Sequence, residues 1–257
     1  MSFFTGIQIF EPNPRLSFYN CTVRKNNTNS NDLEPKIVAK QVIKKEILAG
    51  DAIYSPIIIN GSTTFVLCSE GFWARDRANA SYIATTGHCS VANTNFYLRK
   101  QVDPSDLIGH MIYQLQLPDF GLIRLNLQNV RPIPCVRNKK SSQYPELRIK
   151  DHIVVSSIGA HLCHSGATTN VDCGYLKSLN GDGFVKIPTY FTDDILIVDA
   201  WSRKGDSGGP VFYYKDLMNV GLNGLLISSV SDQISGILAA VPLSSILNTV
   251  DITVVTA

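Results

Sequence analysis

The 257-residue sequence predicts an all-β protein. From Ile47 onward, short apolar runs of strand length alternate with breaks rich in Gly, Pro, Asn and Asp. Long helical periodicity is lacking, and the length suits a double β-barrel or a sandwich with a sizeable core. We expect one short closing helix from Pro242 to Leu247, because proline is well suited to the first turn of a helix.

Ten runs are expected to be strands: 54–59, 64–68, 82–86, 121–125, 152–158, 184–187, 195–200, 210–214, 222–230 and 234–241. The polar stretch 138–150 has no apolar periodicity and divides these runs into comparable halves, so we expect it to connect two β-rich units. Residues 1–46 contain three prolines, an Asn/Thr/Ser cluster and a basic run, which indicates a flexible or processed leader. The expected organisation is a leader at 1–46, an N-terminal barrel at 47–140 and a C-terminal barrel at 141–257.

Composition excludes several classes of partner. The formal net charge of +2 is too weak to favour nucleic acid or an anionic membrane, and no apolar segment reaches the roughly 18 residues of a membrane helix. Six cysteines without CxxC pairs predict disulfides in an oxidising compartment and no metal site. Sequons at Asn20, Asn26, Asn60 and Asn79 fit a secreted glycoprotein, although Met1 does not open a recognisable signal peptide.

The segment Gly205–Pro210 carries the strongest chemical signal. A serine flanked by glycines can occupy a sharp turn where its hydroxyl is exposed and N–H groups converge on a developing oxyanion. The string also fits the nucleophile elbow of α/β-hydrolases, but that arrangement needs a histidine after the serine, and all five histidines precede Ser207. The order acid, histidine, serine fails too, because nothing around Asp51 or Asp76 recommends those residues.

The remaining order is His88, Asp119, Ser207. His88 follows the strand-like run 82–86, and Asp119 leads into the run 121–125. Histidine, then acid, then serine is one of the known chain orders of a catalytic triad. We therefore interpret these three residues as a catalytic constellation, and His110, His152 and His161 as structural or surface residues.

Five motifs in this order resemble the streptogrisin and α-lytic protease branch of the chymotrypsin-fold serine peptidases. The resemblance runs from about Ile47 to Leu247 and is carried by Ile47–Tyr54, Thr86–Cys89, Asp119–Ile123, Cys163–Thr169 with Cys173-Gly174, and Gly205–Pro210. It implies two six-stranded antiparallel Greek-key barrels with a short C-terminal helix. It also implies a monomeric serine endopeptidase that acts on protein or peptide substrates without metal or cofactor.

The resemblance assigns roles to single residues. Ser207 would attack the scissile carbonyl, His88 would transfer its proton, and Asp119 would orient His88. The N–H groups of Gly205 and Ser207 would form the oxyanion hole.

Disulfides follow from the same resemblance, which implies that Cys68 pairs with Cys89 beside the histidine and that Cys163 pairs with Cys173. Cys21 and Cys135 would then tie the leader to the first barrel, as in disulfide-linked zymogens. Cleavage near Glu46 and Ile47 would leave that leader attached.

The chain departs from the resemblance at His164, where an arginine is expected to pair with Asp206. We hypothesise that a charged His164 pairs with Asp206 and supports the oxyanion loop. The free ammonium of Ile47 could instead pair with Asp206, and a neutral His164 could donate an ordinary hydrogen bond. The sequence leaves these three alternatives open.

The predicted specificity pocket is a second departure. Trp201 stands where a cysteine is expected, and Ser228, Ser229 and Val230 replace the usual edge strand. This bulky pocket predicts small or modest apolar side chains at the cleaved residue.

Other functions remain alternatives. The chain could be an inert homologue that acts as a secreted binding protein, or an esterase on the same scaffold. Arg203 and Lys204 are interpreted either as an exposed loop or as a weak preference for acidic residues on the leaving side.

Overall fold

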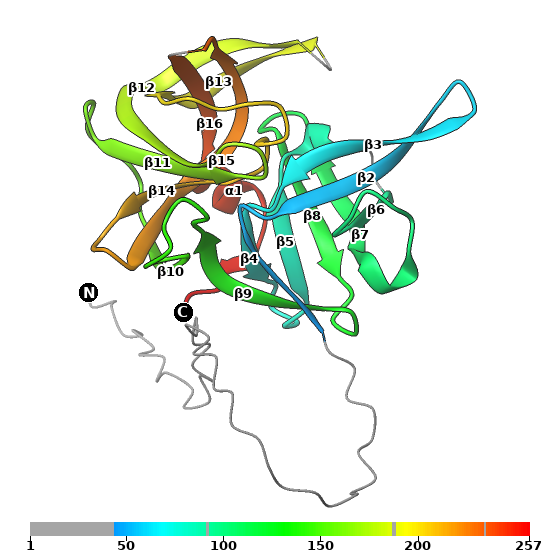
Figure 1. The fold of residues 1–257 in the computed structure, drawn as a ribbon. Helices are drawn as coiled ribbons and strands as arrows, with labels where there is room; N and C mark the ends of the chain where they lie inside the picture. The colour runs from blue at the N-terminus through cyan, green and yellow to red at the C-terminus, as the bar shows by residue number, and fades with distance from the viewer. Residues whose placement is uncertain (1–43, 91–92, 187–188, 234) are drawn as a thin grey trace, which may run out of the picture.

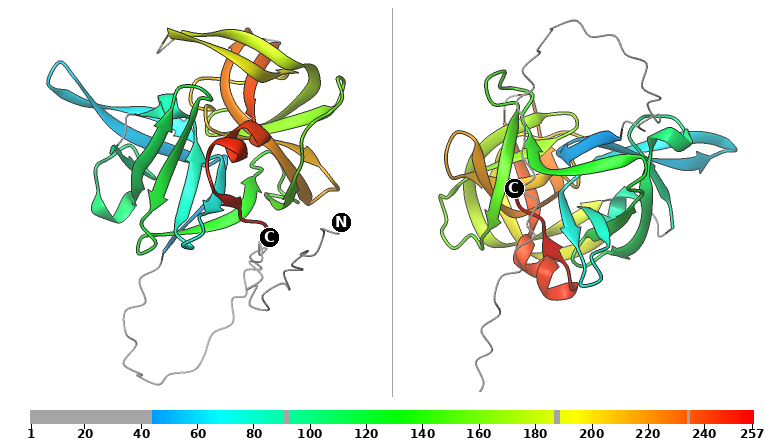
Figure 2. Two further views of the ribbon diagram at one scale, coloured as in Figure 1. Left: turned by 180° about the vertical axis from the view of Figure 1, so that it is seen from behind. Right: turned by 90° about the horizontal axis from the view of Figure 1, so that it is seen from below.

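The computed structural model describes residues 44–90, 93–186, 189–233 and 235–257 (Figure 1). Two β-rich units lie side by side, and Figure 2 shows the same arrangement from behind and from below. Most of the predicted leader, including Cys21 and the sequons at Asn20 and Asn26, lies outside the described residues.

The N-terminal unit is an eight-stranded sheet in the order β17-β4-β5-β8-β7-β6-β2-β3. Its strands are β2 Ala52–Ile59, β3 Ser62–Ser69, β4 Phe72–Arg75, β5 Ser81–Thr85, β6 Asn95–Tyr97, β7 Leu107–Leu115, β8 Phe120–Leu125 and β17 Thr253–Val254. Two short 3₁₀ helices, η1 Gly87–Cys89 and η2 Pro104–Asp106, interrupt its connections. The strand β17 brings the end of the chain back to this unit by pairing with β4.

The C-terminal unit is built on a nine-stranded sheet in the order β1-β9-β10-β15-β14-β11-β12-β13-β16. Pairing of β15 with β16 closes six of its strands into a ring. The strands are β1 Lys45–Ala49, β9 Val130–Arg137, β10 Glu146–His152, β11 His161–Gly166, β12 Asn170–Lys186, β13 Thr189–Asp199, β14 Pro210–Tyr214, β15 Asn219–Ser231 and β16 Gly236–Pro242. The helix α1 Leu243–Thr249 follows β16 directly.

The predicted fold class is confirmed: the chain is mostly β, with a closed six-stranded barrel, a second sheet and one short C-terminal helix. The expectation of purely antiparallel pairing is wrong at two places, because β1 pairs in parallel with β9 and β10 pairs in parallel with β15. Each of these partners is reached through a long connection, and a parallel pair requires such a crossover rather than a hairpin.

Two predicted boundaries are also corrected. β10 begins within the stretch 138–150 that we expected to be a connector, whereas residues 153–158 of the predicted run 152–158 form no strand. Leu147 and Ile149 of β10 are buried between polar neighbours, so this strand has a short alternating pattern that the charged composition hid. Ile153 and Val154, by contrast, are exposed. Strands β1, β4, β6, β7, β9, β11 and β17 were not predicted.

Three apolar clusters hold the fold together. One fills the N-terminal sheet around Ile83 and Phe96, and another fills the ring around Leu176 and Leu226. The third joins the two units, with Phe72 and Phe120 from one unit packed in a cluster that also contains Phe212 and α1 residues. Because protein interiors are close-packed, this shared cluster fixes the units against each other.

No helix among the described residues is long and apolar enough to cross a bilayer.

Glu70 is an unusual residue at the junction, between β3 and β4. Its side chain is fully buried, and neither carboxyl oxygen has a hydrogen-bond partner among the residues that the structure describes. Burial raises the pKa of Glu70 well above its usual value of 4.5, and the neighbouring Asp51 carboxylate raises it further, while Arg137 opposes the shift. Arg137 is already engaged, since its Nε and Nη2 donate to Asp51 at 2.8 and 2.9 Å. The structure therefore favours a neutral Glu70.

Substitution of Glu70 by glutamine tests this protonation state. A pKa that is raised in the folded state favours folding at low pH, and this contribution is lost as the pH rises through the raised value. Each unit of difference corresponds to about 1.4 kcal/mol. We expect the unfolding free energy of wild type to fall from acid to alkaline pH more steeply than that of Glu70→Gln, measured by urea titration.

Glu46→Gln is the matched control because Glu46 is partly exposed and paired with Arg131. Equal pH slopes for wild type and Glu70→Gln would contradict a neutral buried Glu70.

Candidate functional site

His88 and Asp119 contact each other at the end of the N-terminal sheet. Nδ1 of His88 lies 2.5 Å from Oδ2 of Asp119, and the backbone N–H of His88 donates to Oδ1 at 3.0 Å. The Asp119 side chain is 1% exposed and that of His88 is 16% exposed. A carboxylate accepts only from a protonated nitrogen, so Nδ1 carries the hydrogen and Nε2 is the free basic nitrogen.

Local structure positions both residues. His88 belongs to η1, which begins directly after β5, and Asp119 immediately precedes β8, the partner of β5. Gln114 braces the histidine turn because its Nε2 donates to the carbonyls of Gly87 at 2.8 Å and Ser90 at 2.6 Å. Gly87 allows this close approach, since a Cβ there would lie 2.2 Å from the Leu115 carbonyl oxygen.

Ser207 lies in the turn between β13 and β14 and is held against the N-terminal unit by Ser69. The Ser69 N–H donates to the Ser207 carbonyl at 2.8 Å, and its hydroxyl donates to the Gly205 carbonyl at 2.8 Å. Sγ of Cys89, next to His88, lies 4.0 Å from the Ser207 carbonyl oxygen. The fold thus brings the three predicted triad residues to one junction. The sequence carried no signal that singled out Ser69 or Gln114.

The turn around Ser207 separates its backbone N–H groups into two sets. Those of Asp206, Gly208 and Gly209 donate to the carbonyls of Arg203, Leu226 and Asp206 at 2.7 to 3.0 Å. The N–H groups of Gly205 and Ser207 have no hydrogen-bond acceptor in the described part of the chain. Gly205 has φ of +101°, a left-handed conformation that favours glycine. These two N–H groups lie on either side of Asp206 in the chain. Converging N–H groups that are not bonded elsewhere are what stabilises an oxyanion.

Asp206 is buried and organises this turn. Its Oδ1 accepts from the N–H groups of Thr168 and Thr169, both at 2.9 Å. Its Oδ2 accepts from the Arg203 N–H at 2.8 Å and from the Thr169 hydroxyl. Neither Thr168 nor Thr169 was predicted to support the site.

These contacts correct the predicted pairing of Asp206 with His164. Among the described residues, His164 makes no hydrogen bond or ion pair with Asp206. Its Nε2 donates instead to the Trp201 carbonyl at 2.9 Å. Ile47 is buried in β1 opposite Pro132 of β9 in the intact chain. Its alternative role requires a free ammonium, which forms only on cleavage, so that pairing with Asp206 stays a prediction. Four local donors already surround the carboxylate. The physical reason is that the turn just before β12 brings neutral donors from Thr168 and Thr169 to the Asp206 carboxylate, so no positively charged partner is needed.

His164 is fully buried, and its Nδ1 has no hydrogen-bond partner in the described part of the chain. Nε2 carries the hydrogen because a carbonyl oxygen can only accept. A proton on the buried Nδ1 would have no acceptor, so the ring is neutral with its hydrogen on Nε2. Burial lowers the pKa of His164 below its usual value of 6.5, although the Trp201 carbonyl and Asp206 oppose the shift. The hypothesis of a charged His164 is thus wrong.

Two predicted disulfides are present, between Cys68 and Cys89 and between Cys163 and Cys173. Both bring cysteines close to a histidine, as metal sites do, but these sulfurs are engaged in disulfides and are not thiolate ligands. Cys135 is buried in β9, and its expected pairing with Cys21 stays a prediction because Cys21 lies outside the described residues.

The predicted pocket residues occupy two neighbouring segments. The indole Nε1 of Trp201 donates to the Asp232 carbonyl at 2.8 Å, and the Trp201 N–H donates to Asp172 Oδ2 at 2.8 Å. Ser228 and Ser229 are half-buried at the outer end of β15, whereas Val230 is 81% exposed. A register shift between Leu226 and Ser228 places one extra residue before them. Val230 therefore does not fill a buried pocket.

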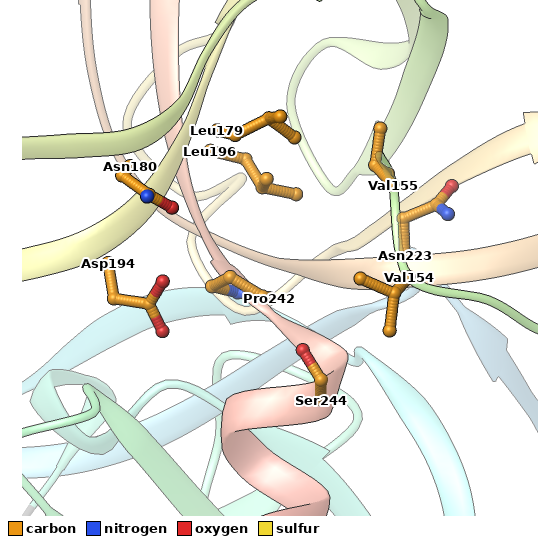
Figure 3. A pocket seen from close by; sticks show the side chains of 9 residues that line it. All are labelled: Val154, Val155, Leu179, Asn180, Asp194, Leu196, Asn223, Pro242 and Ser244. Carbon is orange, nitrogen blue, oxygen red and sulfur yellow. The ribbon is translucent and has the colours of Figure 1, made fainter. Parts of the chain in front are cut away.

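A separate cavity of about 200 Å³ lies between the ring and α1 (Figure 3). Its walls are mostly aliphatic, with the side chains of Asn180 and Asp194 pointing inward. The lining residues are Val154, Val155, Leu179, Asn180, Asp194, Leu196, Asn223, Pro242 and Ser244. None of them belongs to the predicted site, so this cavity is distinct from it.

The neutral state of His164 predicts a loss of stability in acid. Because its folded pKa is lowered, the unfolded chain binds more protons below about 6.5, and stability falls as the pH falls through this range. We expect His164→Gln, whose amide can still donate to Trp201, to reduce this loss in urea titrations between pH 7 and pH 5. His110→Gln, at an exposed position, serves as the control. An unchanged acid slope in His164→Gln would contradict the assignment.

Comparisons with known proteins agree with this geometry. The family model described as Trypsin matches residues 78–247, more than half of the chain. No curated protein sequence matches.

Similar solved structures share the fold. Protease A of Thermobifida fusca is 22% identical, with a TM-score of 0.65, covering 82% of this chain and all of its own. Cellulomonas bogoriensis chymotrypsin is 20% identical, with a TM-score of 0.62 and coverages of 82% and 100%. A glutamic acid-specific serine protease that uses a histidine triad in substrate binding is 23% identical, with a TM-score of 0.65 and coverages of 81% and 100%. The chain belongs to the trypsin family and is a serine endopeptidase with the chymotrypsin fold.

Proposed function

We propose that the chain hydrolyses peptide bonds through an acyl-enzyme on Ser207, with His88 as proton carrier and Asp119 as its orienting carboxylate. The observation that carries this proposal is the buried contact of Asp119 with Nδ1 of His88, beside the turn that presents Ser207. This contact directs the basic nitrogen of His88 away from the carboxylate.

The chemistry then follows in two steps. Nε2 of His88 takes the proton of the Ser207 hydroxyl as its oxygen attacks the scissile carbonyl, and returns the proton to the leaving amine. A water molecule then gives a proton to His88 while its oxygen attacks the acyl carbonyl. The ester bond to Ser207 breaks, the peptide acid leaves, and His88 returns the proton to the Ser207 oxygen. Negative charge that develops on the carbonyl oxygen is met by the N–H groups of Gly205 and Ser207, and one such donor contributes about 3 kcal/mol.

The proposed setting is extracellular, with the protein acting as a monomer on protein or peptide substrates. Two disulfides support an oxidising compartment. The sequons at Asn60 and Asn79 lie in exposed turns, where a glycan can be accommodated.

We further propose that residues 1–46 are a zymogen leader, and intact-mass analysis tests this. Glu46 and Ile47 pair with Arg131 and Pro132 of β9, so cleavage between them requires β1 to open first. The active protein should show one mass without reductant, and reduction should release the leader through loss of the bond between Cys21 and Cys135. Release of the leader without reductant, or an active chain that is never cleaved, would contradict the proposal.

Labelling with a fluorophosphonate probe tests the triad. Wild type should react, whereas Ser207→Ala should not, and His88→Ala should lose roughly six orders of magnitude in kcat. Asp119→Asn should lower kcat about ten-thousand-fold, because the wrong tautomer of His88 is then stabilised. Ser157→Ala, at an exposed position in the connection after β10, is the control and should react as wild type does.

The alternatives give different results. A folded, processed protein that binds no probe would be the inert homologue that serves as a binding protein. A protein that is labelled and hydrolyses esters but no peptide would be the esterase.

A further inference from the structure

The guanidinium of Arg203 lies over the indole ring of Trp201, with Cζ 4.2 Å from the ring centroid. Arg203 is exposed, and no carboxylate pairs with it within the described ranges. Its guanidinium donates no hydrogen bond to any described residue, so its N–H groups remain open to a ligand. An exposed cation that is held against an aromatic face, yet has no anionic partner, is prepared to bind one.

Both halves of this contact are anchored. The Arg203 N–H donates to buried Asp206 at 2.8 Å, which ties the start of the side chain to the turn that carries Ser207. Trp201 is held through its N–H by Asp172, through its carbonyl by His164 and through Nε1 by the Asp232 carbonyl. The platform under the guanidinium is therefore fixed at three points. Fixing a long side chain in advance reduces the entropy that binding would otherwise cost.

The position of the pair relates it to the bond that is cleaved. The family resemblance predicts that the side chain of the residue supplying the scissile carbonyl lies beside the segment that precedes Gly205. That segment is Trp201–Lys204. The guanidinium of Arg203 lies over the ring of Trp201, whose Nε1 donates to the Asp232 carbonyl after β15. This contact holds the charge beside Trp201, within the segment where that substrate side chain is expected.

The exposed charges beside Trp201 are the cations of Arg203 and Lys204 and the carboxylate of Asp232, which accepts from the Ser235 N–H at 2.7 Å. Lys204 follows Arg203 and is exposed, while the carboxylate of Asp206 is buried and saturated by its four donors. Asp172 lies 3.8 Å from Lys140 and accepts from the Trp201 N–H, so it is engaged elsewhere.

We propose that Arg203, positioned by Trp201, binds the carboxylate of an aspartate or glutamate that supplies the scissile carbonyl, so that the enzyme cleaves after acidic residues. This inference rests on the proposed peptidase function. It replaces the expectation that the residue before the scissile bond is apolar. It also assigns the acidic preference of Arg203 to that residue and not to residues on the leaving side. The physical reason is that Trp201 supports a cation with its ring instead of presenting the ring as an open apolar pocket.

Matched fluorogenic peptides that carry Glu or Gln before the scissile bond test the proposal. A hydrogen-bonded charge pair is worth roughly tenfold to a hundredfold, so wild type should cleave the Glu peptide with that advantage in kcat/KM. Arg203→Gln should lose the advantage while keeping its rate on the Gln peptide, and Arg203→Lys should retain part of it. Raising the salt concentration should reduce the wild-type advantage, because an exposed pair is screened.

Lys204→Gln is the matched control, since it removes an equal charge from the next residue but leaves the contact with Trp201 intact. The proposal expects it to keep most of the preference for Glu, and an equal loss in Lys204→Gln and Arg203→Gln would overturn the specific role of Arg203. Trp201→Leu should weaken the preference for Glu while probe labelling of Ser207 persists.

The two proposals fail differently. A protein that reacts with the fluorophosphonate but cleaves both peptides equally would overturn the acidic preference and leave the peptidase function intact. A protein that neither reacts nor cleaves would refute the peptidase function and this inference with it.

Discussion

The rest of the site depends on how Asp206 is buried. A carboxylate removed from water must be satisfied by donors, and here the N–H groups of Thr168, Thr169 and Arg203 and the Thr169 hydroxyl surround it. These bonds curl residues 203–206 into a tight turn. The same curl leaves the N–H groups of Gly205 and Ser207 unbonded within the described chain. One buried charge thus shapes the nucleophile turn without needing another charge beside it.

The second constraint is the junction between the two units. His88 and Asp119 come from the N-terminal sheet, whereas Ser207 comes from the C-terminal one. Ser69, at the end of β3, connects the two units by donating to the carbonyls of both Gly205 and Ser207. The disulfide between Cys68 and Cys89 joins the same strand to the turn that carries His88. The shared apolar cluster supports this junction from behind. A shift of one unit would therefore separate His88 from Ser207.

Polar groups behind the turn set the chemistry of its surroundings. His164 is neutral because burial outweighs the nearby carboxylates, and it uses its one hydrogen to hold Trp201. Trp201 in turn supports Arg203, so a buried neutral residue is linked to an exposed cation through an aromatic ring. Burial raises the pKa of Glu70 above 4.5 and lowers the pKa of His164 below 6.5. Stability therefore falls at alkaline pH through Glu70 and at acid pH through His164, and it is greatest between these two usual values.

The sequence by itself determined the all-β class, the closing helix, the two described disulfides and the residues His88, Asp119 and Ser207 as candidates. The fold class, the helix and the three candidates follow from short-range patterns: strand-length apolar runs, a glycine-flanked serine and motifs in a specific order. The two disulfide pairings were implied by the family resemblance that these motifs carry. Only the tertiary structure decided the partners of Asp206, the charge of His164 and the position of Arg203, because each depends on segments far apart in sequence that meet only after folding. It also decided that β10 is a strand and that 153–158 is not, since burial against β9 and β15 outweighs local composition. Hydrogen-bond satisfaction and desolvation act between such segments, and no local pattern records them.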